Sequence, residues 1–382
     1  MDHLERRPRC LAACLAATLA WPLAGHTGGT TPEAPPPVER TEVSVQPFYG
    51  PLRARDLTPF GYLRLDMRPA YSGAIAPGGW AIESEFGYQN TWALSGPVEK
   101  YLQARPERRG LTAADVAAIR ALPGENYLVD LELGELDVTL HRRVTPHWGA
   151  FLIVSAAAYG GGALDGAIEQ FHSAFGMTDK GRRGLARDQM NVVMDLDSLQ
   201  YASLDGRARN GLLDPTLGVR YTGVTLPAPW SFALEAAVKV PVAGQRDFLS
   251  TGRLDTGLQA SVMRRGDRHA FYGSIAVVDY AGSDGDAQPD ARIVPTVVVG
   301  FESHLTARVH SIVQLYASPS IYDGDDTGLS ALTSNKYQLS LGMRYHRGSH
   351  LLTFALTENL ANMNNTPDVG LQLGWGYRPQ GH

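Results

Sequence analysis

The stretch from Asn335 to Tyr345 alternates strictly between apolar and polar residues. The odd positions hold a tyrosine at each end and three apolar residues between them: Tyr337, Leu339, Leu341, Met343 and Tyr345. The even positions are polar or glycine: Lys336, Gln338, Ser340, Gly342 and Arg344. Because successive side chains of a strand point to opposite faces, this stretch predicts a β-strand with one apolar face. Aromatic rings at both ends of the apolar band are typical of a strand that crosses a bilayer.

The same alternation recurs along most of the chain, from Trp80 to Tyr377. We expect about twelve such strands, an even number, as in bacterial outer-membrane barrels. Three stretches fit less well. The apolar phase of Tyr127 to Arg143 switches at Gly134-Glu135, which predicts a bulge. Arg268 to Tyr280 is apolar on both faces, and residues 189–202 have strand character without a clear place.

The connections between the expected strands alternate in length. Short turns, such as Thr145-Pro146 and Gly348-Ser349, alternate with long polar loops, such as residues 160–209. Outer-membrane barrels have short turns on the periplasmic side and long loops outside the cell. The first long loop contains a predicted helix at residues 112–121, which Thr112 and Asp115 can cap.

The N-terminal region divides into segments that precede the expected barrel. Residues 1–25 predict a secretory signal peptide, with arginines before an apolar run and small residues at its end. Residues 26–46 are rich in proline and threonine and predict a disordered periplasmic leader. Residues 47–79 contain too many prolines for a central strand, so we expect them at the barrel mouth or as a plug. The barrel itself is expected over residues 80–378.

Composition excludes several classes of protein. Both cysteines, Cys10 and Cys14, fall in the expected signal peptide, so the exported chain has no disulfide and no cysteine-bound metal. The formal net charge of −5 argues against nucleic acid as a partner. The sequence has no dinucleotide, P-loop or zinc motif, so we expect no cofactor, no metal and no catalytic residue. The expected location is the bacterial outer membrane. The expected partners are its lipids and lipopolysaccharide, and the barrel-assembly machinery during insertion.

Three parts of the chain together resemble an uncharacterised bacterial family known as domain of unknown function 3187. They are the segment Gly50 to Arg55, the run Gly161 to Gly176 and the expected strands after Leu212. The resemblance implies an outer-membrane β-barrel with no established activity, so it assigns no site residues. The helix expected at residues 112–121 departs from the family pattern.

The polar faces of the expected strands carry charges of both signs. An arginine or lysine facing lipid at the bilayer centre costs about 2–4 kcal/mol, so we expect these side chains to face the lumen. The candidates are Glu83, Glu85, Asp137, His141, Asp214, Arg220, Glu235, Lys239, Asp255, Arg308, His310, Lys336 and Arg344. They could line a polar channel, or they could form ion pairs that only stabilise the barrel.

Residues 164–175 predict a short amphipathic helix in an extracellular loop. Leu164, Ile168, Phe171 and Phe175 fall on one apolar stripe, and so short a helix needs its stripe buried. We therefore expect the helix to fold over the extracellular opening as a gate, with His172 as a packing or gating residue. A hydrolase would need His172 close to a hydroxyl and an acid. The adjacent serine is a poor partner because consecutive helical side chains point about 100° apart.

One acidic loop resembles a metal site. Residues 323–328 have Asp, Asp and Thr at the first, third and fifth places and Gly at the sixth, as calcium loops do. The twelfth place is Ser334 instead of the usual Glu, so we expect an ordinary acidic surface loop.

These patterns predict an all-β fold: a single-domain antiparallel transmembrane β-barrel of about twelve strands, with short helices in extracellular loops. The leading hypothesis for function is a narrow channel or passive uptake pore for small polar solutes. The alternatives are a structural or envelope-interaction barrel with a blocked lumen and a membrane-embedded lipid hydrolase.

Overall fold

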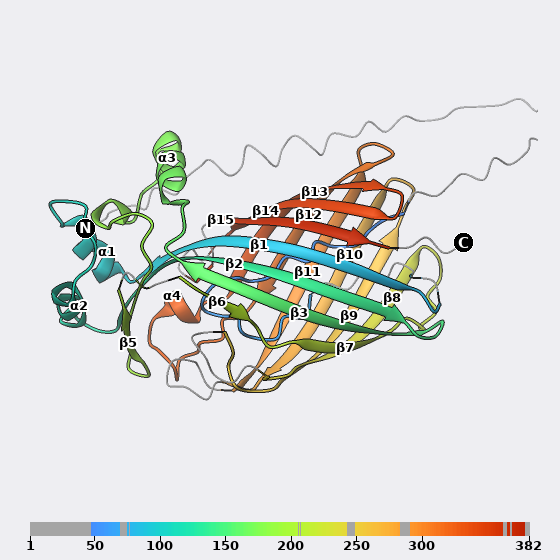
Figure 1. Cartoon of the computed structure of the whole chain (residues 1–382), viewed down its shortest axis with the longest axis horizontal. Coiled ribbons are helices and arrows are strands. Elements are labelled where there is room, and N and C mark those ends of the chain that lie inside the picture. The colour runs from blue at the N-terminus through green and yellow to red at the C-terminus, as the bar shows by residue number, and fades with distance from the viewer. Residues whose placement is uncertain are drawn as a thin grey trace, which may run out of the picture. The chain divides into compact units, whose positions relative to one another are not determined.

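The computed structural model forms one antiparallel sheet that closes on itself (Figure 1). It describes residues 47–68, 75, 77–204, 206, 208–242, 249–282, 291–361, 365–366 and 369–378. The expected signal peptide and leader lie outside these residues. Within them the strands are β1 (Trp80–Leu94), β2 (Asn126–Arg143), β3 (Trp148–Gly160), β4 (Asn191–Asp195), β5 (Gln200–Ser203), β6 (Arg209–Leu212), β7 (Thr216–Tyr221), β8 (Trp230–Lys239), β9 (Asp255–Arg265), β10 (His269–Tyr280), β11 (Arg292–His304), β12 (Val309–Ser318), β13 (Lys336–Arg347), β14 (His350–Asn359) and β15 (Val369–Tyr377).

Twelve strand positions make up the closed wall, which confirms the fold predicted from the sequence. β1 pairs with β15 from Ile82↔Tyr377 to Asn90↔Val369 and so joins the two ends of the sheet. β6 and β7 both pair with β3, so together they occupy one place in the wall. β4 and β5 form a hairpin that pairs with the first residues of β2. This hairpin accounts for residues 189–202, which the sequence pattern left unplaced.

The outer face of the wall is apolar, as β13 illustrates. Leu341 and Met343 each expose 51% of their surface, whereas Lys336 and Ser340 expose 2% and 3%. Exposed tryptophans lie near the end of the barrel where the turns are short, among them Trp148. A broad exposed apolar surface bordered by aromatic rings is the surface that a bilayer covers.

The predicted bulge in β2 is wrong. The pairing of β2 with β1 and with β3 runs without interruption through Gly134 and Glu135. The apolar phase switches because the surroundings of the strand change. Leu136 is 44% exposed on the outer, lipid-facing side, whereas Leu131 and Leu133 are buried on the inner side. The interior of the barrel is therefore apolar at the end with the long loops, and the apolar residues of β2 turn inward there.

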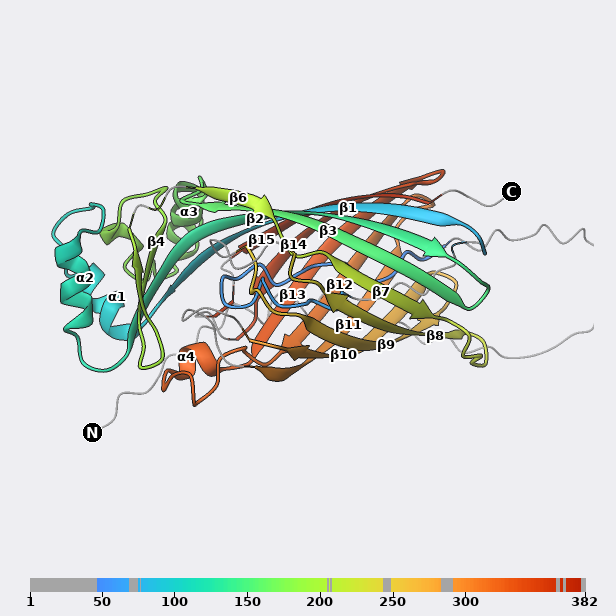
Figure 2. The same ribbon diagram turned by 60° about the horizontal axis from the view of Figure 1, so that its bottom comes forward.

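Residues 47–68, here called the internal segment, run through the interior of the barrel (Figure 2). Phe48 packs against Ala270 near one end of β10, and Leu65 packs against Ala276 further along the same strand. The inward side chains of β10 are apolar because the internal segment covers them. This packing explains why the sequence of β10 is apolar on both faces.

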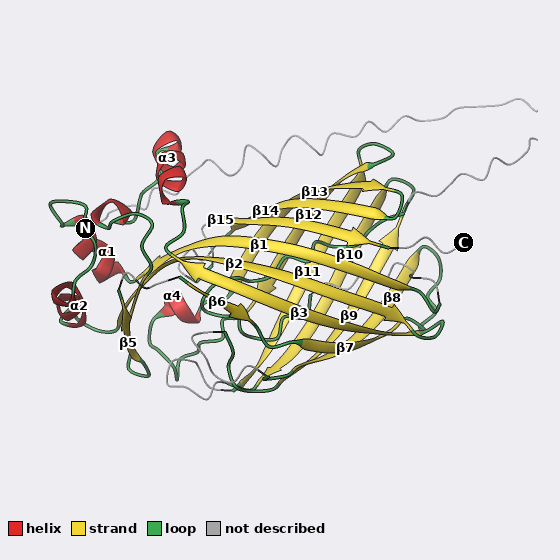
Figure 3. Cartoon of the chain, viewed as in Figure 1, coloured by secondary structure: helices red, strands yellow, loops and turns green. Residues whose placement is uncertain are grey.

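The helices all lie at the end of the barrel with the long loops (Figure 3). They are α1 (Gly96–Gln103), α2 (Ala113–Arg120), α3 (Asp165–Phe175), the short 3-10 helix η1 (Arg182–Gly184) and α4 (Ser330–Thr333). Thr112 is the N-cap of α2. The side chains of Thr112 and Asp115 each accept the backbone N–H of the other residue, which is the expected capping arrangement. α1 and α2 share a small core around Leu102 and Ile119. None of the helices in the described residues is long and apolar enough to cross a membrane.

Candidate functional site

Buried polar groups hold the start of the internal segment. The Glu302 carboxylate accepts the backbone N–H of Tyr49 at 3.1 Å and lies 2.6 Å from Nδ1 of His310. Arg344 donates to the carbonyl of Pro51 at 2.7 Å. The side chains of Glu302 and His310 are completely buried. Because an unpaired charge is costly away from water, these contacts fix the segment at this end of the lumen.

Three arginines of the internal segment, Arg53, Arg55 and Arg68, face carboxylates on β1 and β2. The carboxylates are Glu83, Glu85, Glu135 and Asp137. Arg53 lies 3.5 Å from Glu83, and Arg68 lies 3.6 Å from Glu85 and also pairs with Asp137. All of these side chains are 15% exposed or less. Opposite charges on the segment and the wall therefore neutralise each other inside the barrel.

Two lysines of the wall hold the far end of the internal segment. Nζ of Lys336 lies 2.6 Å from the Asp56 carboxylate. Nζ of Lys239 donates to the carbonyl of Leu63 at 2.7 Å and pairs with Asp255 at 2.9 Å. The Asp56 carboxylate also accepts a hydrogen bond from the Thr58 hydroxyl at 2.7 Å. Lys336 and Asp56 therefore neutralise each other inside the lumen.

The predicted lumen-lining residues occupy the strand faces that the alternation assigned, with two exceptions. Arg308 lies in the exposed turn between β11 and β12, and Asp214 lies in the link between β6 and β7. Arg220 and Glu235 pair with each other at 2.6 Å, and Asp214 accepts a hydrogen bond from Ser250 at 2.5 Å. The other candidates are Glu83, Glu85, Asp137, His141, Lys239, Asp255, His310, Lys336 and Arg344, all buried or half-buried.

Sequence reasoning missed several groups that complete these contacts. Glu135 escaped because the expected bulge obscured the face to which it points. Glu302 lies on the inner face of β11, where the buried apolar residues Val294 and Val298 mask the alternation. The arginines of the internal segment could not be assigned, because a segment without strand periodicity gives no facing direction. A signal was nevertheless available in the pattern Arg53-Ala54-Arg55, whose charges needed partners inside a barrel.

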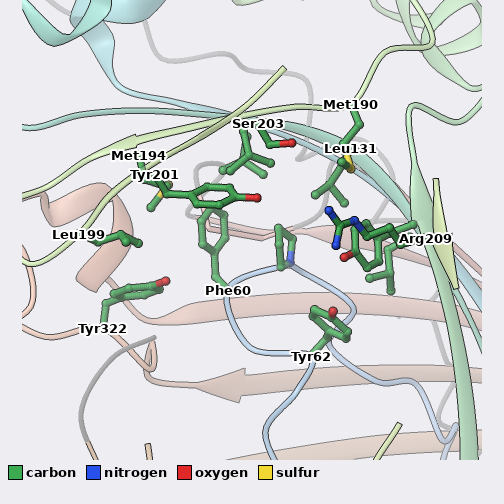
Figure 4. Close-up of a pocket in the computed structure, with 15 residues that line it drawn as sticks. Phe60, Tyr62, Leu131, Met190, Met194, Leu199, Tyr201, Ser203, Arg209 and Tyr322 are labelled. Carbon is green, nitrogen blue, oxygen red and sulfur yellow. The ribbon is translucent and has the colours of Figure 1, made fainter. Parts of the chain in front are cut away.

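An apolar pocket with a volume of about 70 Å³ lies inside the barrel at the end with the long loops (Figure 4). Three parts of the chain supply most of its lining: the inner face of β2, the tip of the internal segment and the β4–β5 hairpin with its flanking residues. They contribute Val129, Leu131 and Leu133, then Phe60 and Tyr62, and then Met190, Met194, Leu199 and Tyr201. Flexible methionine side chains allow such a pocket to adapt its shape.

The pocket has few polar groups. The hydroxyl of Tyr62 is buried and has no hydrogen-bond partner among the residues that the structure describes. Arg209 and Ser203 also line the pocket, and Figure 4 shows Arg209 on the same side as Tyr62. A mostly apolar cavity with a few polar groups is the usual form of a small-molecule site. The unpaired hydroxyl marks a position where a bound molecule could supply a hydrogen bond.

The predicted gate helix is formed, but it is not buried as expected. Ile168 is buried and Leu164 is half-buried, whereas Phe171 and Phe175 expose 53% and 69% of their surface. His172 follows Phe171 in the same helix and is half-buried. The second half of the stripe is left uncovered because another side of α3, with Asp165 and Glu169, carries the contacts that fix the helix to the protein.

The acidic loop does not present its carboxylates freely. Arg292 lies 2.9 Å from Asp323 and 2.6 Å from Asp326. In the described part of the chain, no group of three or more His, Cys, Asp or Glu side chains is arranged to hold a metal. Arg292 therefore occupies the position that a cation would take between these two carboxylates.

A closed antiparallel wall with an apolar outer belt, long loops at one end and short turns at the other defines a bacterial outer-membrane β-barrel. Residues 107–378 match the model of the family described as "Protein of unknown function (DUF3187)". The chain therefore belongs to this family, as the sequence resemblance indicated. No curated protein matches the chain.

Among solved structures, the chain is similar to the COG4313 outer membrane channel from Pseudomonas putida F1. The identity is 12%, the TM-score is 0.49, and the match covers 82% of this chain and 99% of that one. It is also similar to a Pseudomonas aeruginosa FadL homologue, with 10% identity, a TM-score of 0.36 and coverage of 87% and 100%. A third similarity is to the translocator domain of the autotransporter NalP from Neisseria meningitidis, with 8% identity, a TM-score of 0.34 and coverage of 79% and 89%.

Proposed function

We propose that this barrel is an uptake channel for small, largely apolar molecules that carry a hydrogen-bonding group. The apolar pocket carries this proposal. It combines aliphatic side chains of β2 with the rings of Phe60 and Tyr62, and it includes a buried hydroxyl that has no hydrogen-bond partner within the described part of the chain. A molecule with an apolar body and one hydroxyl satisfies both features.

The contacts inside the lumen favour this solute class over the polar solutes expected from the sequence. The inward charges are engaged by the internal segment or by each other, as in the pairs Lys336–Asp56 and Lys239–Asp255. Charges used in this way do not offer a polar solute free ligands along its path. We propose that the internal segment acts as a plug and that a solute passes only when part of it shifts.

A structural or envelope-interaction barrel is the second candidate. The extensive ion pairing between the internal segment and the wall supports it, because a permanently filled lumen needs the same contacts. The two candidates differ at the pocket. A structural barrel needs no ligand there, whereas a channel for apolar molecules must bind one.

Titration of the purified barrel with benzyl alcohol tests the proposal, with arabinose as a polar solute for comparison. We expect benzyl alcohol to raise the unfolding temperature and arabinose to leave it unchanged. Tyr62→Phe should weaken the binding of benzyl alcohol by about two- to ten-fold, because one neutral hydrogen bond is worth about 0.5–1.5 kcal/mol. Leu131→Ser should weaken it further by making the pocket polar.

Leu136→Ser is the matched control, since Leu136 lies on the outer face of the same strand. It should leave the binding of benzyl alcohol unchanged. Binding of arabinose instead of benzyl alcohol would restore the polar-solute hypothesis. If neither compound binds, or if Leu131→Ser and Leu136→Ser have equal effects on binding, the proposal of an apolar-solute channel fails.

A further inference from the structure

The apolar side of α3 is uncovered. Phe171 exposes 53% of its surface and Phe175 exposes 69%, and their ring centroids lie 4.7 Å apart. Met177, just after the helix, is 49% exposed. Large apolar side chains exposed so close together in the chain form an apolar patch, and such patches mark sites of contact with a partner or a membrane.

Ion pairs prevent α3 from turning this side toward the protein. Asp165 pairs with the buried Arg182 at 2.6 Å. One turn further on, Glu169 pairs with Arg108 at 2.8 Å and with Arg187 at 2.5 Å. Rotation of the helix would break these buried contacts. The two phenylalanine rings are therefore held in an outward position by the contacts on the other side of the helix.

The start of α3 lies on the outer side of the barrel wall. The Glu132 carboxylate accepts the backbone N–H of Ala163 at 3.0 Å and of Leu164 at 2.7 Å, and it also accepts the hydroxyl of Tyr88. Glu132 and Tyr88 point to the same outer face as Leu136 and Phe86, which are paired with each other closer to the short turns. α3 thus begins directly beyond the lipid-facing belt, and Figure 1 shows it projecting sideways from the wall.

The charges next to α3 match the surface of the outer leaflet. The stretch from Gly176 to Asp188 contains four basic and two acidic residues. Arg183 and Arg187 expose 65% and 50% of their side chains, although Arg183 also pairs with Asp179 at 3.2 Å. Phosphorylated glycolipid presents anionic groups above acyl chains, so exposed aromatic rings that are followed within about twelve residues by exposed arginines fit that boundary.

We propose that α3 lies in the outer-leaflet interface, with Phe171 and Phe175 inserted among the acyl chains of lipopolysaccharide and with Arg183 at its phosphates. The belt of the barrel already contacts this leaflet, and α3 continues that contact beyond the ends of the strands. The helix is then a lateral anchor that sets the height of the extracellular loops. This inference does not depend on the solute or on whether the barrel transports one.

Site-directed spin labelling tests the proposal in a Cys10→Ser/Cys14→Ser chain, which has no other cysteine. Labels are attached at Phe175→Cys or at Ser173→Cys, which lies on the opposite side of α3. The protein is reconstituted in vesicles that contain bisphosphorylated lipid A. We expect oxygen, which concentrates in the acyl region, to relax the label at residue 175, and a water-soluble nickel chelate to relax the label at residue 173.

A second comparison tests the phosphate contact. Arg183→Gln should shift the label at residue 175 toward the aqueous phase in lipid A vesicles but not in vesicles of neutral lipid. Equal access of the nickel chelate to residues 173 and 175 would overturn the proposal. Dipolar broadening between labels at residue 175 would overturn it as well, because it would assign the rings to a contact between two copies.

Discussion

Lys336 and Asp56 form a buried pair that joins the wall of the barrel to the internal segment. Lys336 is 2% exposed, and its Nζ donates a further hydrogen bond to the hydroxyl oxygen of Thr58 at 3.0 Å. Breaking a buried ion pair by removing one partner costs about 3–5 kcal/mol, mainly because the remaining charge is left without a counterion. The pair is therefore a sensitive point for the position of the internal segment.

We expect Lys336→Met to release the internal segment near residue 56. Because the Asp56 carboxylate would be left alone in the lumen, the first effect should be protease access to residues 53–58, before the barrel unfolds in heat-modifiability gels. The double variant Asp56→Asn/Lys336→Met is the control, since it removes both charges. Equal protease sensitivity of the single and double variants would show that the ion pair does not hold the segment.

The facing direction of residues such as Lys336 and Arg344 could be predicted from the sequence, but their partners could not. Alternation assigns both side chains to the polar face of β13 because a strand has only two faces. Their contacts, Asp56 and Pro51, lie in a segment without periodicity, almost three hundred residues away in the chain. The residue pattern thus predicts which face of the strand a charged side chain occupies. Its partner depends on the path of the internal segment through the lumen.

At the scale of elements, α3 illustrates a helix fixed by its polar side. Its existence followed from the spacing of its apolar residues, but its orientation did not. The expectation that Phe171 and Phe175 would be buried assumed that the protein itself must cover an apolar stripe. Asp165 and Glu169 lie off the apolar stripe and are buried, because Arg182 and Arg187 from the segment after α3 and Arg108 from an earlier loop reach them. Ion pairs between loops decided the orientation, and no local pattern encodes them.

The attachment of α3 to the rest of the protein through Glu169 should depend on pH. Burial opposes the charge on Glu169, but hydrogen bonds from Arg187 and Arg108 lower the pKa of its carboxyl to about 2. A carboxyl whose pKa is lower in the folded state stabilises the fold above its unfolded pKa of about 4.3, and this stability is lost as pH falls toward about 2. We expect a spin label at Ser173→Cys to become more mobile across this range.

Glu169→Gln is the control for this titration. Because the amide cannot ionise, the variant should show a mobile label already at neutral pH and little further change on acidification. If the label stays equally immobile from pH 5 to pH 2 in the chain that retains Glu169, the ion pairs with Arg108 and Arg187 do not hold α3 in place.

At the scale of the whole molecule, the lumen is defined by the internal segment as much as by the wall. Strand alternation predicted the barrel and its strand number because the bilayer imposes the same apolar period on every strand. The filling of the lumen could not be predicted in the same way. The inner faces of β2 and β10 carry apolar residues where they meet the pocket or the segment, and these residues blurred the alternation. The departures from the pattern therefore coincide with the candidate site.

Deletion of residues 47–68 should raise the single-channel conductance of the barrel in planar bilayers. The wall charges released by the deletion, such as Glu85 and Asp137, would become hydrated by the water that replaces the segment, so the barrel should stay folded. An intact heat-modifiable band is the control for folding. Unchanged conductance in a folded deletion variant would mean that another part of the chain closes the lumen.

The closure of β15 on β1 has a consequence for the order of assembly. β15 is made last, and its pairing with β1 completes the ring around residues that precede every strand. After closure, a segment could enter the lumen only through one of the two ends of the barrel. We therefore expect the internal segment to dock on β1 and β2 through Arg55 and Arg68 while the sheet is still open. The earliest residues of the described chain would then act as the template around which the later strands wrap.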